Sequence, residues 1–522
     1  MRKAAIAMLL FGVMAPVFTV CAGNATQTGA PIVKISSGKV QGFMEEGTMA
    51  FKGIPYASVE RFMPPRPVEK WDTVRLCTEW GPQAMQGGRN STNPKEMSED
   101  CCVLNVWTTD LKGKKPVMLW CHGGGFDSGT SAWNPGMGLA KKDVVVVSLN
   151  HRLNIMGFLD LSGTGNPKYR ESGNVGMLDV VAALHWIQDN IAKFGGDPGN
   201  VTVFGESGGG GKVGTLMCMP SAKGLFHKAI IMSGTILNVN TNAMSKELGL
   251  AVLKELDIPV DQVERINDVP YDKLYQAGQR AMAASIGTRQ PGTPMMWGFG
   301  PTPDGEVLLQ QPFQPGFASI SDNIPLVIGT TFNELQRGQY QRSMTLEQAK
   351  DAVRATFGAE TDAYADALAA AWPDFVPQDL PSIDPMFRAK TLVTIDSESA
   401  RRSAPLYNYM FTWKSPLNGV SAHGAELNFC FNTLHLAGRD LPSPSDSDLL
   451  LADRMAQSWA NFAHTGNPNV NGLPEWHPYT VENGECFMFG PTPEIRGNFD
   501  RELQEIINSH CFKKLEEFYR TH

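Results

Sequence analysis

The stretch Asn200–Gly209 reads NVTVFGESGG, and it decides the fold. Its first half carries the β-branched run Val201–Val203, which is typical of a buried strand. Its second half, Gly205–Gly209, fits the pattern G-x-S-x-G, and an apolar helical stretch follows it. A strand, a sharp turn that carries a serine and then a helix form the arrangement called a nucleophile elbow. We therefore expect Ser207 to be a nucleophile at the carboxyl end of a strand.

The glycines after this serine allow a second interpretation, a phosphate-binding loop, because Gly208–Lys212 reads GGGGK. A P-loop follows the pattern GxxxxGK and continues with Ser or Thr. Its first glycine would fall on Glu206, and Val213 stands where the hydroxyl residue is needed. The spacing therefore excludes a P-loop and favours the elbow.

Strands and helices alternate on both sides of this motif. Short apolar runs predict buried strands, and apolar residues at spacings of three and four predict helices. Strands interleaved with helices indicate an α/β fold with a largely parallel sheet. The predicted strands are Val117–Trp120, Val144–Val147, Val201–Val203, Ala229–Met232, Leu326–Ile328 and Tyr407–Phe411, and the predicted helices are Met177–Ile191 and Leu449–Ala463.

Two further segments have the pattern of helical insertions over one face of the sheet. They are Asn240–Met296 and the Ala-rich stretch Leu346–Trp372. They are candidates for a lid or for the walls of a pocket. The mature chain, 26–522, is accordingly predicted to be a single catalytic domain.

A serine hydroxyl is a poor nucleophile unless a histidine takes its proton and an acid orients that histidine. In folds with this elbow the chain order is nucleophile, acid, histidine, so both partners should follow Ser207. Glu334 lies in the loop after the Leu326–Ile328 strand, and His423 lies among small residues after the Tyr407–Phe411 strand. These two are the predicted partners. Polar or terminal surroundings indicate surface histidines at His435, His464, His477, His510 and His522.

A triple glycine follows the Val117–Trp120 strand in the sequence HGGGF, His122–Phe126. Glycines allow the backbone to approach a substrate closely and to turn its amides inward. After a buried strand in a chain with an elbow serine, the motif indicates half of an oxyanion hole. The predicted donors are the amides of Gly124, Gly125 and Gly208.

Further motifs extend the pattern over nearly the whole mature chain. They are FKGIPYA (51–57), RFMPPRPVEKW (61–71), EMSEDC (96–101), LNVW (104–107), the run from GNVGMLD to FGESGG (173–209), IIMSGT (230–235), VIGTTFNE (327–334) and HGAELNF (423–429). In combination they resemble the type-B carboxylesterases, the group that includes the cholinesterases.

That resemblance implies the α/β-hydrolase fold, with a central mostly parallel sheet flanked by helices and helical insertions over the active site. It implies a serine carboxylesterase that forms an acyl-enzyme on small-molecule esters without metal or organic cofactor. The family's triad falls on Ser207, Glu334 and His423, and its oxyanion donors fall on Gly124, Gly125 and Gly208. Glu206 and Ser233 match positions that support the triad from behind.

Three departures from the family pattern bear on the chemistry. The usual disulfide partner of the SEDC cysteine is replaced by Ala84, so Cys101 is either free or bridged to Cys77. The segment 90–92, Asn-Ser-Thr, occupies the region of the choline-binding tryptophan, so a choline ester is not expected. Gly208 replaces the more usual alanine after the serine, which preserves the donor and loosens the elbow.

Composition limits the alternatives. The 522 residues carry 45 Lys and Arg against 53 Asp and Glu, a formal charge of −8. This balance lacks the basic footprint of a nucleic-acid-binding protein. Neither the density of the nine cysteines nor their spacing to histidines indicates a disulfide scaffold or a zinc site. Apolar surroundings predict buried free thiols at Cys121, Cys218 and Cys430.

The first 25 residues read as a secretory signal peptide. Arg2 and Lys3 precede an apolar stretch, and small residues follow at Ala22 and Ala25, after either of which cleavage is expected. Val20 is bulky where lipoprotein signals carry a small residue, so secretion or periplasmic export is favoured over a lipid anchor on Cys21. No other apolar run is long enough to cross a bilayer, and the mature protein is expected to be exported and soluble.

Two other functions share these motifs. A cholinesterase-like binding module would have lost the triad, whereas all of its positions are filled here. Carbamates, thioesters or activated amides would be cleaved by the same groups. With a His423 base, activity should fall as the pH drops through about 6.5. Met295, Met296, Trp297 and Phe299 in the segment 292–300 are candidates to line the acyl pocket.

Overall fold

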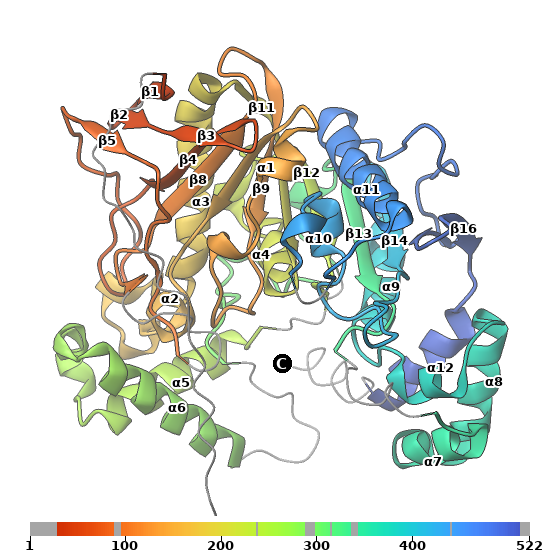
Figure 1. Cartoon of the computed structure of the whole chain (residues 1–522). Coiled ribbons are helices and arrows are strands. Elements are labelled where there is room, and N and C mark those ends of the chain that lie inside the picture. The colour runs from red at the N-terminus through yellow and green to blue at the C-terminus, as the bar shows by residue number, and fades with distance from the viewer. Residues whose placement is uncertain are drawn as a thin grey trace, which may run out of the picture. The chain divides into compact units, whose positions relative to one another are not determined.

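An eleven-stranded sheet is the framework of the protein (Figure 1). The computed structural model describes residues 29–87, 96–235, 239–287, 298–313, 316–335, 343–438 and 441–511. By its contacts the chain divides into residues 1–30 and residues 31–522, and the sheet belongs to the second unit. The predicted signal peptide lies outside the described residues.

The middle of the sheet is parallel and its two edges are antiparallel. All neighbouring strands from β10 to β15 run parallel, and the pairs outside them run antiparallel. In spatial order the strands are β16 (Glu494–Gly497), β15 (Glu485–Phe489), β14 (Leu406–Phe411), β13 (Leu326–Thr331), β12 (Lys228–Met232), β11 (Gly196–Glu206), β9 (Lys115–Cys121), β10 (Val145–Leu149), β8 (Val103–Thr108), β4 (Thr48–Pro55) and β3 (Phe43–Glu45).

Every strand predicted from the apolar runs is present, and the α/β class is confirmed. The edge strands were not predicted. β11 also begins earlier than expected, because Gly196 pairs with Lys115 before an irregularity that lasts until Val201. Two small sheets complete the strands: β1 (Ile32–Ile35), β2 (Gly38–Gln41) and β5 (Val74–Leu76) form one, and β6 (Gln83–Ala84) and β7 (Met97–Ser98) form the other.

Alternate residues of the central strands enter two different cores, one on each face of the sheet. In β9, Val117 and Leu119 pack in one core, and Met118 and Trp120 pack in the other. The period of two in strand side chains produces this division, and burial on both faces accounts for the continuous apolar runs. The first core includes α3 (Val175–Asn190) and α4 (Gly208–Leu216), and the second includes α1 (Met137–Ala140) and α11 (Asp446–Thr465).

The two predicted insertions are helical. The first contains α5 (Asn242–Glu255) and α6 (Tyr271–Gly287), and the second contains α7 (Leu346–Phe357) and α8 (Thr361–Ala371). In Figure 1 the two pairs lie at the same end of the sheet, at the lower left and lower right. The remaining helices are α2 (Asn154–Phe158), α9 (Phe387–Ser399), α10 (Leu427–Cys430) and α12 (Arg501–Cys511).

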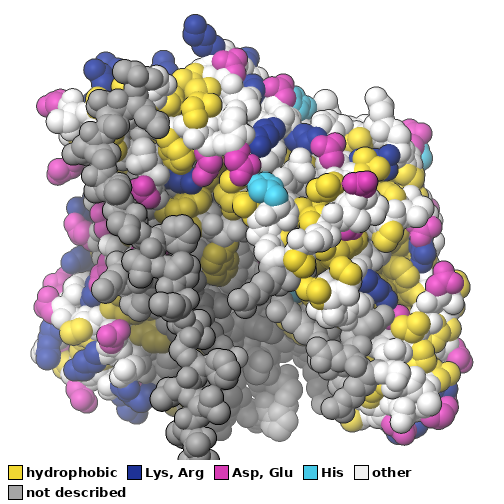
Figure 2. Space-filling view, viewed as in Figure 1, with side chains coloured by type: hydrophobic (Ala, Val, Ile, Leu, Met, Phe, Trp, Pro, Cys, Tyr) yellow, Lys and Arg dark blue, Asp and Glu magenta, His cyan; other side chains and the backbone are white. Residues whose placement is uncertain are grey.

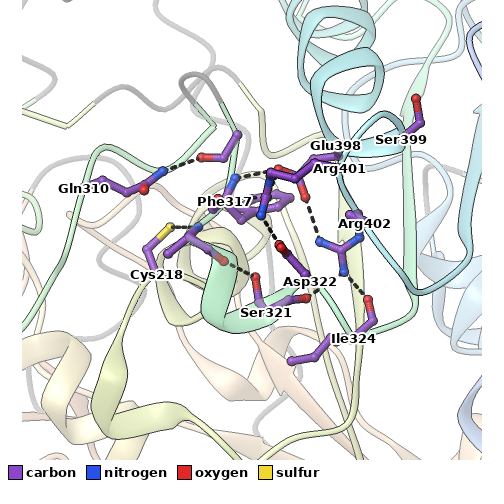
Figure 3. A network of polar contacts seen from close by, with 12 residues as sticks. Cys218, Gln310, Phe317, Ser321, Asp322, Ile324, Glu398, Ser399, Arg401 and Arg402 are labelled. Atoms are coloured by element: carbon purple, nitrogen blue, oxygen red, sulfur yellow. Dashed lines mark hydrogen bonds and ion pairs between the residues drawn. The ribbon is translucent and has the colours of Figure 1, made fainter.

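A buried ionic network joins the end of α9 to the segment that leads into β13 (Figure 3). Glu398 is fully buried, and its carboxylate lies 2.7 Å from guanidinium nitrogens of both Arg401 and Arg402. It also accepts a hydrogen bond of 2.8 Å from the Phe317 amide. Buried charge is tolerated only where partners surround it, so this network fixes the entry to β13 in one conformation.

The surface carries mixed charge. On the face in Figure 2, basic and acidic side chains are interspersed and form no basic stripe on the atoms described. None of the helices in the described part of the chain is long and apolar enough to span a bilayer. Cys77 and Cys101 are both buried and free, which resolves the two alternatives for Cys101, and Cys121, Cys218 and Cys430 are buried free thiols as predicted.

Candidate functional site

Ser207 occupies a strained turn between β11 and α4. Its backbone has φ 56° and ψ −124°, a conformation that residues other than glycine rarely adopt. The turn is held at both sides, because the Ser207 amide donates to Met232 O at 2.8 Å and its carbonyl accepts from the Gly211 amide at 3.0 Å. A Cβ on Gly209 would lie 2.0 Å from Cys121 O, so only glycine fits beside the serine there.

Glu334 and His423 come together from two neighbouring strand ends. Glu334 is fully buried in the loop after β13, and its Oε2 bonds to Nδ1 of His423. The other carboxylate oxygen accepts hydrogen bonds from Ser233 Oγ and from the Thr331 amide, both at 2.7 Å. The His423 amide also donates to Glu334 O at 2.9 Å. Glu334 therefore fixes the histidine through its backbone amide and through Nδ1. The other ring nitrogen, Nε2, points toward the elbow.

The second ring nitrogen faces the residue before the serine. His423 Nε2 lies 3.1 Å from Glu206 Oε1. Among the residues that the structure describes, no hydrogen bond joins the Ser207 hydroxyl to His423. Catalytic hydrogen bonds are often long before substrate binds. The structure thus brings together Glu334, His423, Ser233 and Glu206, with Ser207 next to Glu206 in the chain.

The two carboxylates change the protonation of the histidine. Burial lowers the pKa of His423, but the charge of Glu206 and the hydrogen bond to Glu334 outweigh burial and raise the pKa to about 9. The sequence-based expectation of an acid limb near pH 6.5 used an unperturbed histidine and is corrected by this environment. The general base should become available at a higher pH.

The glycine motif after β9 presents unused donors. Gly124 and Gly125 have φ of 87° and 63°, which only glycine adopts readily. Their amides donate no hydrogen bond to any residue in the described ranges. Gly208 begins α4, so its amide has no carbonyl one turn before it.

Gly208 and the glycine motif approach each other closely. A Cβ on Gly208 would lie 2.3 Å from both N and O of Gly125. Because Gly208 has no side chain, the glycine motif can pack directly against the start of α4. It was expected to loosen the elbow, whereas it permits close packing.

Several residues around His423 were not predicted from the sequence. The Phe387 ring lies 4.9 Å from the His423 ring, centroid to centroid. Asp384 accepts hydrogen bonds from the Met386 amide at 2.9 Å and the Arg388 amide at 2.6 Å, and burial and Glu334 raise its pKa to about 7. No sequence motif marks these residues. They lie at the start of α9, which comes close to His423 only in the folded chain.

Glu426 is a second buried carboxyl group near His423. It is fully buried, and burial together with the charges of Glu206 and Glu334 raises its pKa well above the ordinary value. The sequence offered a signal, since Glu426 stands three residues after His423 in HGAELNF.

A cavity of about 260 Å³ opens beside the histidine, and its walls include His423, Gly424, Trp413 and Phe429. Met295, Met296 and Trp297 of the predicted acyl pocket lie outside the described residues, and Phe299 is buried. Within the described ranges, no group of three or more His, Cys, Asp or Glu side chains is arranged to hold a metal ion.

Comparisons with known proteins place this arrangement in a family. The family model described as "Carboxylesterase family" matches residues 29–374 and 381–506. The chain is 33% identical to the para-nitrobenzyl esterase of Bacillus subtilis, over 91% of this chain and 98% of that protein. It is 32% identical to the liver carboxylesterase of Sus scrofa, over 90% and 92% of the two chains.

Solved structures agree with this result. An esterase from Clostridium hathewayi, described as able to hydrolyze aliphatic aromatic polyesters, superposes with a TM-score of 0.84 at 33% identity, over 93% of this chain and 99% of that chain. A carboxylesterase from Geobacillus stearothermophilus gives a TM-score of 0.74 at 32% identity, over 90% and 98% of the two chains. Both similarities extend over the sheet and the surrounding helices.

Proposed function

Because the chain belongs to the carboxylesterase family, whose members are carboxylic ester hydrolases of the α/β-hydrolase fold, we propose that it cleaves esters through Ser207, His423 and Glu334. The observation that carries this proposal is the contact between the buried Glu334 carboxylate and Nδ1 of His423. It fixes the ring and leaves Nε2 on the side of the elbow. Small-molecule esters are the substrates that the family implies.

In the proposed first step, His423 Nε2 takes the proton of Ser207 Oγ as that oxygen attacks the ester carbonyl. The negative charge that develops on the carbonyl oxygen is stabilised by the amides of Gly124, Gly125 and Gly208. His423 then gives its proton to the departing alcohol, which leaves Ser207 acylated. The imidazolium is stabilised by the Glu334 carboxylate.

In the second step, water attacks the acyl-enzyme with His423 again as base, and the acid is released. Ser233 acts on this cycle through Glu334, since its hydroxyl donates to Oε1 at 2.7 Å and leaves Oε2 for the histidine. The support for the oxyanion hole is that the amides of Gly124, Gly125 and Gly208 have no hydrogen-bond partner among the described residues.

The test compares wild type with Ser207→Ala on p-nitrophenyl acetate, butyrate and octanoate. Loss of a triad nucleophile should lower kcat by up to about a millionfold. Ser447→Ala, at an exposed serine of α11, is the matched control and should keep wild-type rates. A rapid burst of p-nitrophenol followed by slower turnover would support the acyl-enzyme. Equal, near-background rates in all three proteins would instead favour a binding module.

The likeness to the Clostridium hathewayi esterase favours a second substrate class. Its TM-score of 0.84 is higher than that of the Geobacillus carboxylesterase. We propose that polyesters with aliphatic and aromatic units lie within the range of this enzyme. Aromatic acid released from a polyester film by wild type, and not by Ser207→Ala, would support this extension. Activity confined to p-nitrophenyl esters would contradict it.

We also propose that the protein is exported, to the periplasm or the medium, after removal of residues 1–22 or 1–25. The charged start, the apolar stretch and the small residues that follow support this proposal.

A further inference from the structure

A fully buried lysine lies behind the glycine motif. Lys212 is in the second turn of α4, the helix that begins after Ser207, and its side chain is inaccessible to solvent. Its Nζ donates hydrogen bonds of 2.9 Å to His122 O and 2.9 Å to Gly125 O. Within the described part of the chain no acidic side chain pairs with it. Backbone carbonyl oxygens are therefore its hydrogen-bond partners.

We call the segment His122–Phe126 the oxyanion loop. Each of its first four backbone carbonyls, 122 to 125, has a polar contact. Between the two carbonyls held by Lys212, Gly123 O contacts Nδ1 of His122 at 2.8 Å and Gly124 O accepts from the Ser128 amide at 3.0 Å. A peptide group is planar, so a fixed carbonyl also fixes the direction of the N–H of the next residue. The Gly123 and Gly124 carbonyls therefore aim the Gly124 and Gly125 amides, which donate no hydrogen bond within the described residues. Lys212 holds the peptide groups on either side of this pair, 122–123 and 125–126.

We propose that Lys212 is a positioning residue for ester hydrolysis: it fixes both ends of the oxyanion loop to the helix that carries Ser207. The loop and the nucleophile come from different strands, β9 and β11, and Lys212 joins them by one side chain. This inference rests on the proposed function, since it needs Gly124 and Gly125 to act as oxyanion donors.

The surroundings of Lys212 agree with a role as a hydrogen-bond donor. The titratable groups that face it are Cys121, His122 and His151, and the two imidazoles stack with centroids 5.4 Å apart. The Phe126 ring also lies against Nζ, with its centroid 5.8 Å away. Burial and Lys212 lower the pKa of His122 to about 3, and burial with the same charge lowers the pKa of His151. Burial also lowers the pKa of Lys212, to about 7, and the neutral amine still has two N–H groups, enough for both carbonyls. The two hydrogen bonds of Lys212 can therefore form on either side of that pKa.

The test compares Lys212→Met with wild type on p-nitrophenyl butyrate and on a trifluoromethyl ketone, which forms an oxyanion adduct with a serine nucleophile. Loss of a true oxyanion donor costs about 100- to 1000-fold, so a misplaced loop should lower kcat by about 10- to 100-fold. KM should change little, because the interaction acts on the transition state. Binding of the ketone should weaken by a factor similar to the loss in kcat.

Lys228→Met is the matched control. Lys228 is also a buried lysine, but it lies at the start of β12 and bonds to Asn200. It should leave kcat and ketone binding unchanged. Lys212→Gln keeps an uncharged N–H donor and should fall between wild type and Lys212→Met, and it replaces that variant if the methionine protein does not fold.

Wild-type kcat, KM and ketone binding in Lys212→Met or its substitute would overturn the inference. Equal losses in Lys228→Met would also overturn it, because the effect would then belong to any buried lysine. If Ser207→Ala retains full activity, the proposed function itself fails. If Ser207→Ala is inactive and Lys212→Met matches wild type, only the role of Lys212 is wrong.

Discussion

Glu206 Oε1 lies 3.1 Å from His423 Nε2, the same ring nitrogen that must accept the Ser207 proton in the proposed mechanism. A carboxylate in this place has two opposite effects. It stabilises the imidazolium that forms during the reaction, and it also favours the protonated ring before the reaction begins. The residue beside the nucleophile therefore sets the pH at which the base becomes available.

The first prediction follows from this contact. His423 can act as a base only when neutral, so kcat/KM should fall as the pH drops through the raised pKa of about 9. Glu206→Gln removes one of the charges that raise the pKa, so the acid limb should move to lower pH. The measurement is kcat/KM from pH 5 to 10 in both proteins. An acid limb at the same pH in wild type and Glu206→Gln would contradict the role of Glu206.

The second prediction concerns Gly208. Alanine is the more usual residue after the family's serine, yet a Cβ here would lie 2.3 Å from Gly125 N. Gly208→Ala should push the oxyanion loop away and lower kcat/KM by about 10- to 100-fold, short of the loss of a donor. The control is Gly199→Ala, at an exposed glycine where a Cβ would meet only Asp197 Oδ1 at 3.3 Å. Unchanged kcat/KM in Gly208→Ala would contradict this prediction, because the oxyanion loop could then move away without loss of activity.

The third prediction concerns stability. Glu398→Ala leaves the buried Arg402 guanidinium without its carboxylate, and removal of one partner of a buried pair costs about 3–5 kcal/mol. Glu60→Ala breaks the exposed pair with Arg66 and should cost at most about 1 kcal/mol. Urea unfolding of both variants measures the difference. Below the unfolding transition, kcat of Glu398→Ala should equal that of wild type, and similar unfolding midpoints for both variants would contradict the buried role.

The fourth prediction concerns the N-terminus. Expression of the whole chain with export should give a mature protein that begins at Gly23 or Thr26, as expected for cleavage after Ala22 or Ala25. Intact-mass measurement and N-terminal sequencing would establish this. Retention of Met1, or a lipid on Cys21, would contradict it.

The sequence predicted those parts of the fold in which local pattern and burial agree. The central strands are apolar on both faces, so their runs were unambiguous, and β9 and β13 were found where expected. β8 was missed as a strand because Asn105 interrupts its pattern. In the structure this amide is buried and donates to Ser131 and Ser148 at 3.0 Å. Such compensation is visible only when distant segments have been brought together.

The candidate site likewise contains residues that sequence patterns indicate and residues that they do not. Ser207 was indicated by its strand–turn–helix context, whereas the choice of Glu334 and His423 rested on chain order and on the family resemblance. The structure brings Glu334 and His423 into contact. Lys212 was considered only as part of a phosphate-binding loop, since lysines are rarely buried without a partner. Its partners are backbone carbonyls in the loop after β9, and no side-chain pattern encodes them.

The helical insertions have a consequence for engineering. α5, α6, α7 and α8 supply none of the proposed triad residues or oxyanion donors, all of which lie in the elbow or in loops that follow strands. These helices can therefore change without replacement of any reacting group of the proposed mechanism. Grafting them from a relative should leave the chemistry of the recipient intact, and directed libraries confined to 242–287 and 346–371 would mutate none of those groups.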